Sequence, residues 1–271
     1  NRQVYAPGDY IGATGLEKEY EEALRGEKGA RYVLKDNMGR VVGSYKDGNL
    51  DSSPKSGVDI TTSLDIELQA YAEALMNGKI GAVVAIEPKT GEILSMLSTP
   101  TYDPNDLTIN RSRGEAVRKL STDTLKPFFN RAVMAKYPPG SIFKPVIGLV
   151  GLQKGHLQPN TYHYCPGFYS YNSFIWGCRN HPAPIGVSTA VQFSCNTYFF
   201  QTFRDLIDKE ESFYKPEVGL DTLVSYFQRF GFGDELGIDF PGEQDGNIPT
   251  SGYYNRLYPK DQGGWKSPTI L

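Results

Sequence analysis

The stretch Tyr137-Pro138-Pro139-Gly140-Ser141-Ile142-Phe143-Lys144-Pro145 decides the fold, because the patterns on both sides of it are organised about the turn that it predicts. A Pro-Pro-Gly run cannot continue a helix, so it ends whatever precedes it. The apolar run at 146–152 is then predicted to form a buried helix. Ser141 therefore lies at the start of this helix, and Lys144, three residues later, lies on the same face.

This pair of residue types suits nucleophilic catalysis. A serine hydroxyl becomes a nucleophile when a base takes its proton, and a desolvated lysine with a lowered pKa is such a base. The N-terminus of a helix adds backbone N–H groups that favour an oxyanion. The spacing alone is weak evidence, since Ser52-Ser53-Pro54-Lys55 matches it too. That second match contains a proline and no apolar helix follows it, so we interpret it as chance.

A second motif, Ser-x-Asn, occurs at Ser170-Tyr171-Asn172 and at Ser194-Cys195-Asn196. The later match lies between two helical patterns, at 186–192 and 197–206, where a loop can project toward the Ser141 helix. A hydroxyl there suits proton relay, and an amide suits binding of a substrate backbone. The alternative interpretation is a Ser or Asn helix cap, which is common. We favour the later match for its position between helices.

Together, these residues carry a family resemblance. Ser141 to Lys144 and Ser194 to Asn196 resemble the first two active-site motifs of penicillin-binding transpeptidases and serine β-lactamases. Nearly all of the chain resembles the elongation-type class B penicillin-binding proteins, the penicillin-binding protein 2 group, through residues 15–26, 64–69, 86–94 and 130–132. The resemblance implies an α+β transpeptidase fold, an antiparallel sheet flanked by helices. It implies a pedestal or dimerisation-like module with a linker at 1–56, and a transpeptidase domain at 57–271.

The resemblance also implies the chemistry. The substrate would be a peptidoglycan stem peptide ending in D-Ala-D-Ala, whose penultimate carbonyl Ser141 attacks while Lys144 takes its proton. Ser194 would relay a proton to the leaving D-Ala, and Asn196 would hold the peptide and orient Lys144. An amine of a neighbouring strand would then resolve the acyl-enzyme, giving cross-linking during cell-wall elongation. β-Lactams would acylate Ser141. The enzyme class is a serine-type D-Ala-D-Ala transpeptidase or carboxypeptidase.

The third active-site motif of the family is expected in another part of the protein. Lys89-Thr90-Gly91 spells the third motif, Lys-Thr-Gly, but it precedes the nucleophile and occupies a predicted turn. We therefore reject it as catalytic and expect the true motif beyond Leu271, in a C-terminal part that this sequence lacks. On this expectation, the piece is inactive by itself.

The three cysteines, Cys165, Cys178 and Cys195, lie within 31 residues, and with His181 they spell Cys-x12-Cys-x2-His-x13-Cys. Three thiolates and an imidazole suit a structural zinc ion. Some elongation-type relatives resemble this in having a zinc site near the second motif. A Cys165–Cys178 disulfide with Cys195 free, or buried thiols, are the alternatives. His163 is a rival ligand.

Composition limits the remaining possibilities. The 271 residues carry a net charge of -3, so the overall charge does not attract the chain to nucleic acid. No apolar run reaches the roughly 18 residues of a transmembrane helix. We expect a piece of a longer protein on the periplasmic side of the inner membrane, with its anchor outside this chain and a membrane glycosyltransferase as partner. The alternatives are a β-lactamase or β-lactam sensor, and a non-catalytic scaffold stabilised by zinc.

Periodicity and turn residues predict the remaining elements. The predicted helices are 15–26, 65–76 (capped by Ser63 or Asp65), 186–192, 197–206 and 220–230. The predicted strands are 31–34 and 41–45 about a turn at 36–39, then 58–62, and 81–87 with 92–98. Irregular structure is expected at 101–125, at the aromatic-rich 159–184, and after 230.

Overall fold

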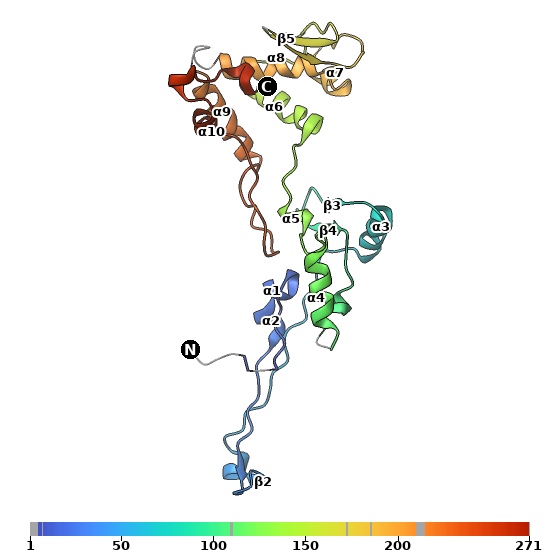
Figure 1. Cartoon of the computed structure of the whole chain (residues 1–271), viewed down its shortest axis with the longest axis vertical. Helices are drawn as coiled ribbons and strands as arrows, with labels where there is room; N and C mark the ends of the chain where they lie inside the picture. The colour runs from blue at the N-terminus through green and yellow to red at the C-terminus, as the bar shows by residue number, and fades with distance from the viewer. Residues whose placement is uncertain are drawn as a thin grey trace. The chain divides into compact units, whose positions relative to one another are not determined.

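The computed structural model describes residues 5–6, 8–108, 111–171, 173–184, 186–209 and 215–270. The chain divides into two compact units, and Figure 1 labels most of their helices and strands. The first unit is Asn1–Ala135 with Gly237–Gln244, and the second is Lys136–Leu236 with Asp245–Leu271. None of the described helices is long and apolar enough to cross a membrane.

The first unit begins with two short helices, α1 (Gly15–Glu19) and α2 (Glu21–Arg25), where one helix was predicted. The break lies at Tyr20, whose φ of -100° and ψ of 16° are not helical. The Tyr20 hydroxyl donates to Asp239 Oδ2 at 2.5 Å. A single helix over 15–26 is therefore wrong, because Tyr20 leaves helical geometry at a residue type that gives no sequence signal of a break.

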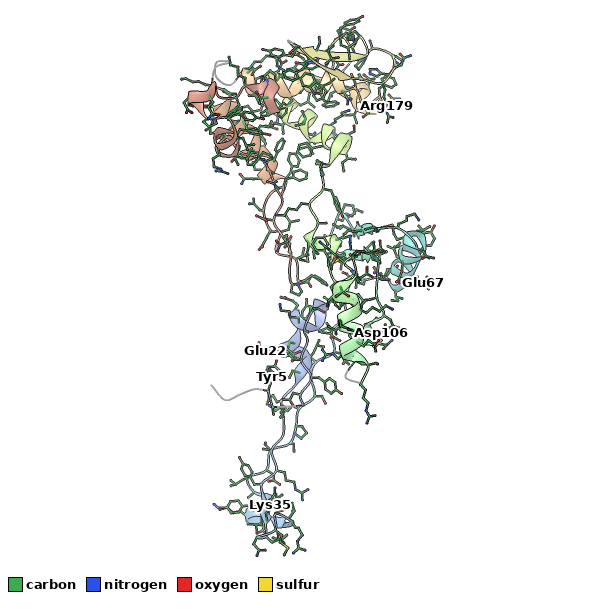
Figure 2. The ribbon with its side chains drawn as sticks, viewed as in Figure 1. Tyr5, Glu22, Lys35, Glu67, Asp106 and Arg179 are labelled. Atoms are coloured by element: carbon green, nitrogen blue, oxygen red, sulfur yellow. The ribbon has the colours of Figure 1, made fainter. Side chains whose placement is uncertain are left out.

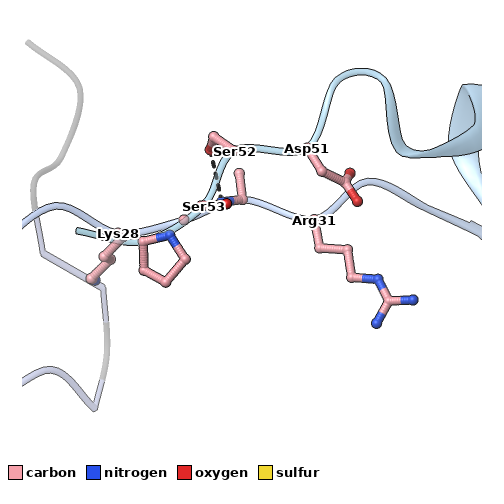
Figure 3. A pocket seen from close by; sticks show the side chains of 8 residues that line it. Lys28, Arg31, Asp51, Ser52 and Ser53 are labelled. Atoms are coloured by element: carbon pink, nitrogen blue, oxygen red, sulfur yellow. Dashed lines mark hydrogen bonds between the residues drawn. The ribbon is translucent and has the colours of Figure 1, made fainter. Parts of the chain in front are cut away.

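The predicted hairpin of the first unit is present. The strands β1 (Val33–Lys35) and β2 (Val41–Ser44) pair antiparallel, and the 3-10 turn η1 (Tyr45–Gly48) follows. The returning chain pairs back at the bridges Glu27↔Lys55 and Ala30↔Ser52. Figure 3 shows the shallow pocket beside this pairing, lined by residues 28–31 and 51–54. The chance Ser-x-x-Lys match therefore lies in a backbone ladder rather than at the start of a helix.

The helix α3 (Ile66–Met76) starts as predicted at Asp65, whose carboxylate accepts from the N–H groups of Glu67 and Leu68. The strands β3 (Gly81–Ile86) and β4 (Ile93–Thr99) also confirm the prediction, with Gly91 at φ 82° in the turn. The expected strand at 58–62 is wrong, since no strand pairs with this segment among the described residues and the Val58 N–H donates to Ala23 O instead.

Segment 101–125, expected to be irregular, contains η2 (Pro104–Leu107) and the helix α4 (Arg113–Thr122). No residue of α4 is buried, and its apolar residues, Ala116, Val117 and Leu120, give only a narrow stripe for periodicity to detect. The short helix α5 (Arg131–Met134) follows, and the Asn130 side chain caps it by accepting from Ala132 N.

The second unit is mainly helical. Its predicted helices are present, and α10 with two 3-10 turns lies where irregular structure was expected. The elements are η3 (Gly140–Phe143), α6 (Lys144–Gln153), α7 (Val187–Gln192), α8 (Asn196–Asp208), α9 (Pro216–Arg229), α10 (Ser251–Leu257), η4 (Lys260–Gln262) and η5 (Ser267–Ile270).

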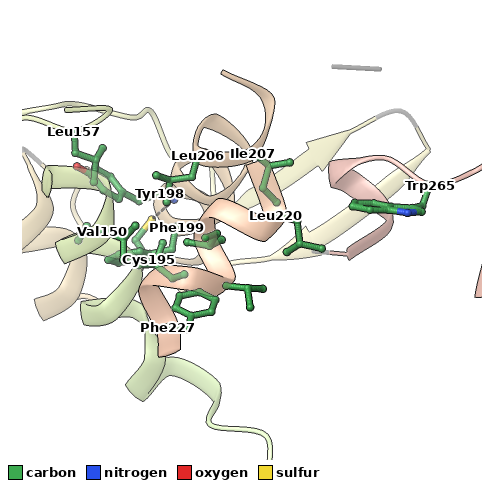
Figure 4. Packing of buried hydrophobic residues seen from close by; sticks show 14 residues of the cluster. Val150, Leu157, Cys195, Tyr198, Phe199, Leu206, Ile207, Leu220, Phe227 and Trp265 are labelled. Atoms are coloured by element: carbon green, nitrogen blue, oxygen red, sulfur yellow. Dashed lines mark hydrogen bonds between the residues drawn. The ribbon is translucent and has the colours of Figure 1, made fainter. Parts of the chain in front are cut away.

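Helices α6, α8 and α9 enclose one hydrophobic core (Figure 4). Val150, Tyr198 and Leu223 are each at most 2% exposed. Gly151 in α6 allows the Leu157 side chain to pack closely against the helix, because a Cβ at this position would lie 2.8 Å from the Leu157 Cδ1 atom. Burial of this apolar surface is the main stabilising contribution, at about 25 cal/mol per Å². The core therefore positions the first turn of α6 and the start of α8.

A hairpin also occurs in the aromatic-rich segment that was expected to be irregular. Its strands are β5 (Phe168–Tyr171) and β6 (Phe174–Gly177), in the register Phe168↔Gly177. One face packs on α8, where the Tyr169 and Trp176 rings lie 5.5 and 5.8 Å from the Phe200 ring. The described strands form three two-stranded antiparallel sheets, so the expected sheet with helical cover corresponds to β3–β4 beneath α3.

Candidate functional site

The site begins at the turn before α6. Gly140 has a φ of 59°, which suits glycine, and it follows two prolines that stop a helix. Ser141 is exposed in the 3-10 turn η3, and Lys144 is the first residue of α6. The pair is thus one turn apart at the start of the helix, as predicted. Within the described residues, no hydrogen bond joins the Ser141 hydroxyl to Lys144.

Lys144 reaches the second motif. Its Nζ donates to the Ser194 carbonyl at 2.7 Å, to Ser194 Oγ at 3.0 Å and to Asn196 Oδ1 at 2.6 Å. These residues are 50 and 52 positions apart in sequence, so only the tertiary packing of α6 against α8 joins them. The structure therefore assembles three of the four residues that the sequence singled out, with Ser141 one turn away.

Burial lowers the pKa of Lys144 below its ordinary value, because the ammonium loses hydration. Cys178 and Cys195 oppose this shift when they are in their thiolate forms, whereas the positive charge of Arg179, labelled in Figure 2, adds to it. A lysine with a lowered pKa is neutral at a lower pH than an exposed one. It is then better suited to take a proton from a hydroxyl.

Ser194 lies in a strained backbone conformation, with a φ of 52°. It follows α7, where Ser194 N donates to Val191 O at 3.0 Å and Cys195 N donates to Ala190 O at 2.9 Å. This is the Schellman pattern, whose left-handed position usually holds glycine. A serine there is disfavoured by about 1 kcal/mol. The sequence did not reveal this turn, because the glycine that signals it is absent.

Asn196 is the first residue of α8, and both ends of its side-chain amide have partners. Its Nδ2 donates to Gly177 O at 2.8 Å, which leaves Oδ1 to accept from Lys144. Its backbone N–H donates to Cys178 Sγ at 3.2 Å. The N-cap of α8 is Cys195, whose sulfur accepts from Tyr198 N. The helix-cap interpretation of Ser194 and Asn196 is therefore wrong.

The earlier Ser-x-Asn match has a different setting. Ser170 lies in β5, and Asn172 lies outside the described residues. Lys89-Thr90-Gly91 forms the turn between β3 and β4, as predicted.

The four predicted metal ligands, Cys165, Cys178, His181 and Cys195, lie together. Their ligand atoms are all within 4.8 Å of one another. Cys178 Sγ lies 3.3 Å from His181 Nε2 and 3.9 Å from Cys195 Sγ. A tetrahedral zinc ion with sulfur ligands at about 2.3 Å separates them by about 3.8 Å, so the donor set fits this ion. All three thiols are free, and the alternative disulfide is not formed.

Neighbouring groups orient this cluster. His181 Nδ1 lies 2.7 Å from Pro182 O, which favours the tautomer with Nε2 free to face the thiols. Burial raises the pKa of Cys178, but hydrogen bonds from Thr197, His181 and Asn196 outweigh it and lower the pKa to about 6. Burial raises the pKa of Cys195 to about 12, so a bound cation would have to displace that proton.

The rival ligand is outside the cluster. The His163 ring packs edge-on against Tyr198 at 4.8 Å, and its Nε2 is buried without a hydrogen-bond partner among the described residues. Burial lowers the pKa of His163 below its ordinary value. The histidine is therefore part of the packing around α8.

Residues 81–263 match the penicillin binding protein transpeptidase domain, and residues 1–62 match the penicillin-binding protein dimerisation domain. The chain is 33% identical to the peptidoglycan D,D-transpeptidase MrdA of Escherichia coli strain K12 over 261 residues. This match covers 94% of the chain and 38% of the relative.

Two solved structures are similar over almost all of the chain. One is Pseudomonas aeruginosa PBP2 in complex with WCK 5153, with a TM-score of 0.74 and 30% identity, covering 98% of this chain and 53% of that one. The other is Helicobacter pylori PBP2 in complex with MreC, with a TM-score of 0.78 and 26% identity, covering 96% and 46%. The chain thus spans less than two fifths of the curated relative and about half of these structures. With the transpeptidase match covering most of its length, the chain belongs to the penicillin-binding protein transpeptidase domain family.

Proposed function

We propose that this chain is part of an elongation-type peptidoglycan D,D-transpeptidase, which cross-links stem peptides through a serine acyl-enzyme. The observation that carries the proposal is the set of hydrogen bonds from Lys144 Nζ to Ser194 and Asn196. It brings a half-buried lysine next to the second motif, one helical turn from Ser141. The similarity to MrdA supports this reaction class.

In the proposed reaction, Ser141 Oγ forms a bond to the penultimate carbonyl carbon of a D-Ala-D-Ala end. Lys144 takes the hydroxyl proton. The bond to the terminal D-Ala breaks, and its nitrogen receives a proton through Ser194, which lies 3.0 Å from Lys144 Nζ. An amine of a neighbouring strand then attacks the ester carbonyl carbon and gives up a proton. The bond from that carbon to Ser141 Oγ breaks and Oγ takes a proton, which restores the hydroxyl and leaves the cross-link. β-Lactams would acylate the same hydroxyl. Activity, substrate and partners belong to the whole protein.

We also propose a zinc ion on Cys165, Cys178, His181 and Cys195. The fit of four donors within 4.8 Å of one another supports it. The ion would supply a structural cross-link, since four protein ligands close a tetrahedral site. Elemental analysis of the full-length protein should give about one zinc per chain. A chain that folds with no bound metal would contradict the assignment.

The remaining assignments follow the family. We propose a pedestal or dimerisation-like module with linker at 1–56 and a transpeptidase part at 57–271, which the matches at 1–62 and 81–263 support. Partners would include a membrane glycosyltransferase and, as in the complex of the Helicobacter pylori relative, an MreC protein. The place of action would be the periplasmic side of the inner membrane.

The test is covalent labelling of the full-length protein by a fluorescent penicillin, followed by mass spectrometry of the labelled peptide. The proposal predicts an adduct on Ser141 that Ser141→Ala lacks. An unlabelled protein with intact Lys144 and Ser194 would overturn it. Rapid turnover of the penicillin would instead favour a β-lactamase, and normal cell shape with Ser141→Ala would favour a non-catalytic scaffold.

A further inference from the structure

The hairpin β5–β6 supplies the acceptor that orients Asn196. Gly177 is the last residue of β6, and its carbonyl accepts from Asn196 Nδ2 at 2.8 Å. The two ends of an amide have opposite hydrogen-bonding roles, so this contact directs Oδ1 to Lys144. The chain after the strand is also held, since Cys178 N donates to Gly167 O at 2.8 Å. The orientation of Asn196 therefore depends on where this hairpin lies.

Arg204 attaches the hairpin to the helix that Asn196 begins. Its Nη1 atom donates to the Tyr169 hydroxyl at 2.9 Å. Its guanidinium carbon lies 4.1 Å from the centre of the Tyr171 ring, a cation–π contact. Both tyrosines are in β5, whereas Arg204 lies on α8, eight residues after Asn196. Asp208, one turn further, holds the other side of the guanidinium at 3.2 Å.

Stability alone does not explain the ion pair between Arg204 and Asp208. The Arg204 and Asp208 side chains are only 17% and 18% exposed. Arg204 Nε and Asp208 Oδ1 are buried with no hydrogen-bond partner in the described part of the chain. Replacement of such a pair by apolar side chains is often neutral or stabilising. An apolar contact does not fix the orientation of the groups that it joins, whereas the hydrogen bond from Arg204 to the Tyr169 hydroxyl does.

We propose that Arg204 is a positioning residue for acylation. Through Tyr169 it fixes the β5–β6 hairpin on α8, so that the Gly177 carbonyl keeps the Asn196 amide directed at Lys144. This inference rests on the proposed function, because acylation of Ser141 is its readout. Without Arg204 the aromatic contacts with Phe200 and the Cys165 and Cys178 ends of the hairpin remain in place. The β5 strand can then tilt on α8, so the Gly177 carbonyl no longer holds the Asn196 amide in one orientation.

The test measures the acylation rate of the full-length protein by a fluorescent penicillin. Arg204→Met should slow acylation about tenfold, and Tyr169→Phe, which removes only the accepting hydroxyl, about threefold. Zinc content should be unchanged in both. Arg229→Met is the matched control, since Arg229 also lies over a tyrosine ring, that of Tyr226 at 5.2 Å, but on α9. It should acylate at the wild-type rate.

A double-mutant cycle separates positioning from general damage. In an Asn196→Ala background, Arg204→Met should cause no further loss, because its effect passes through Asn196. A full additional loss there would overturn the proposal, as would a wild-type rate for both Arg204→Met and Tyr169→Phe. If Arg204→Met does not fold, Tyr169→Phe decides by itself. A wild-type protein that is not labelled at Ser141 would refute the proposed function instead.

Discussion

Two clusters meet at the start of α8, and they are held in different ways. Lys144, Ser194 and Asn196 are joined by hydrogen bonds between protein groups, all complete in this structure. The cysteine cluster places three thiols close to one another and to an imidazole. Cys178 Sγ and Cys195 Sγ lie 3.9 Å apart, and the pKa values of these two thiols are shifted in opposite directions. The first cluster is held by bonds between protein groups, whereas on the proposed assignment a zinc ion would hold the second.

The difference matters because the two clusters share neighbouring residues. Cys195 separates Ser194 from Asn196, and Cys178 Sγ accepts from the Asn196 backbone N–H. A change in the cysteine cluster should therefore reach the polar cluster. A change in the polar cluster should leave the four donors in place, because none of them depends on Lys144.

The largest effect is expected from Lys144→Met, which removes the proposed base and its three hydrogen bonds. Acylation of the full-length protein should fall by about 10² to 10⁴, the usual contribution of a positioned base. Zinc content should stay at the wild-type value. Stopped-flow labelling and elemental analysis measure the two quantities. Loss of zinc together with activity would show that the clusters are not separable in this direction.

The next effect is expected from Cys178→Ser. Zinc should be lost, and the free energy of unfolding should fall on the order of several kcal/mol, since metal binding contributes to folding. Acylation should fall as well, because Asn196 N–H loses its sulfur acceptor. His163→Ala is the control, and it should keep the metal. Retained zinc in Cys178→Ser, or lost zinc in His163→Ala, would contradict the assigned ligands.

The smallest expected effect is the difference in stability between two substitutions of Ser194. Both Ser194→Gly and Ser194→Ala remove the hydroxyl, so both should slow acylation equally. Glycine tolerates the φ of 52° and alanine does not, so Ser194→Gly should be more stable than Ser194→Ala by about 1 kcal/mol. Chemical denaturation measures the difference. Equal stabilities would mean that the backbone at this turn is not strained.

Some turns, caps and helix ends of this structure were predictable because particular residue types strongly favour them. The Asp65 cap, the Gly91 turn and the Pro-Pro-Gly stop each have a residue type with one strong local preference. The grouping of Lys144 with the second motif was predictable only through the family resemblance, because residues 50 positions apart in sequence carry no pairing signal.

Other features of the structure have no such signal in the sequence. Helix α4 has only a narrow apolar stripe, and the hairpin β5–β6 is rich in aromatic residues without a clear alternation of apolar and polar types. The orientation of Asn196 depends on a backbone carbonyl, that of Gly177, and a carbonyl is present at every residue. Ser194 occupies a glycine-like conformation without being glycine. In these places tertiary contacts override the local preference.

The central claim is that Lys144 is the base for Ser141, and the pH dependence of acylation tests it most directly. The neutral amine is the active form, so the rate should rise as pH increases through the pKa of Lys144. Burial lowers that pKa, so the midpoint should lie below the ordinary lysine value of 10.5. Full-length wild type should show this rise, and Lys144→Met should not. A rise of the same midpoint in both proteins, or a flat profile in wild type, would contradict the account.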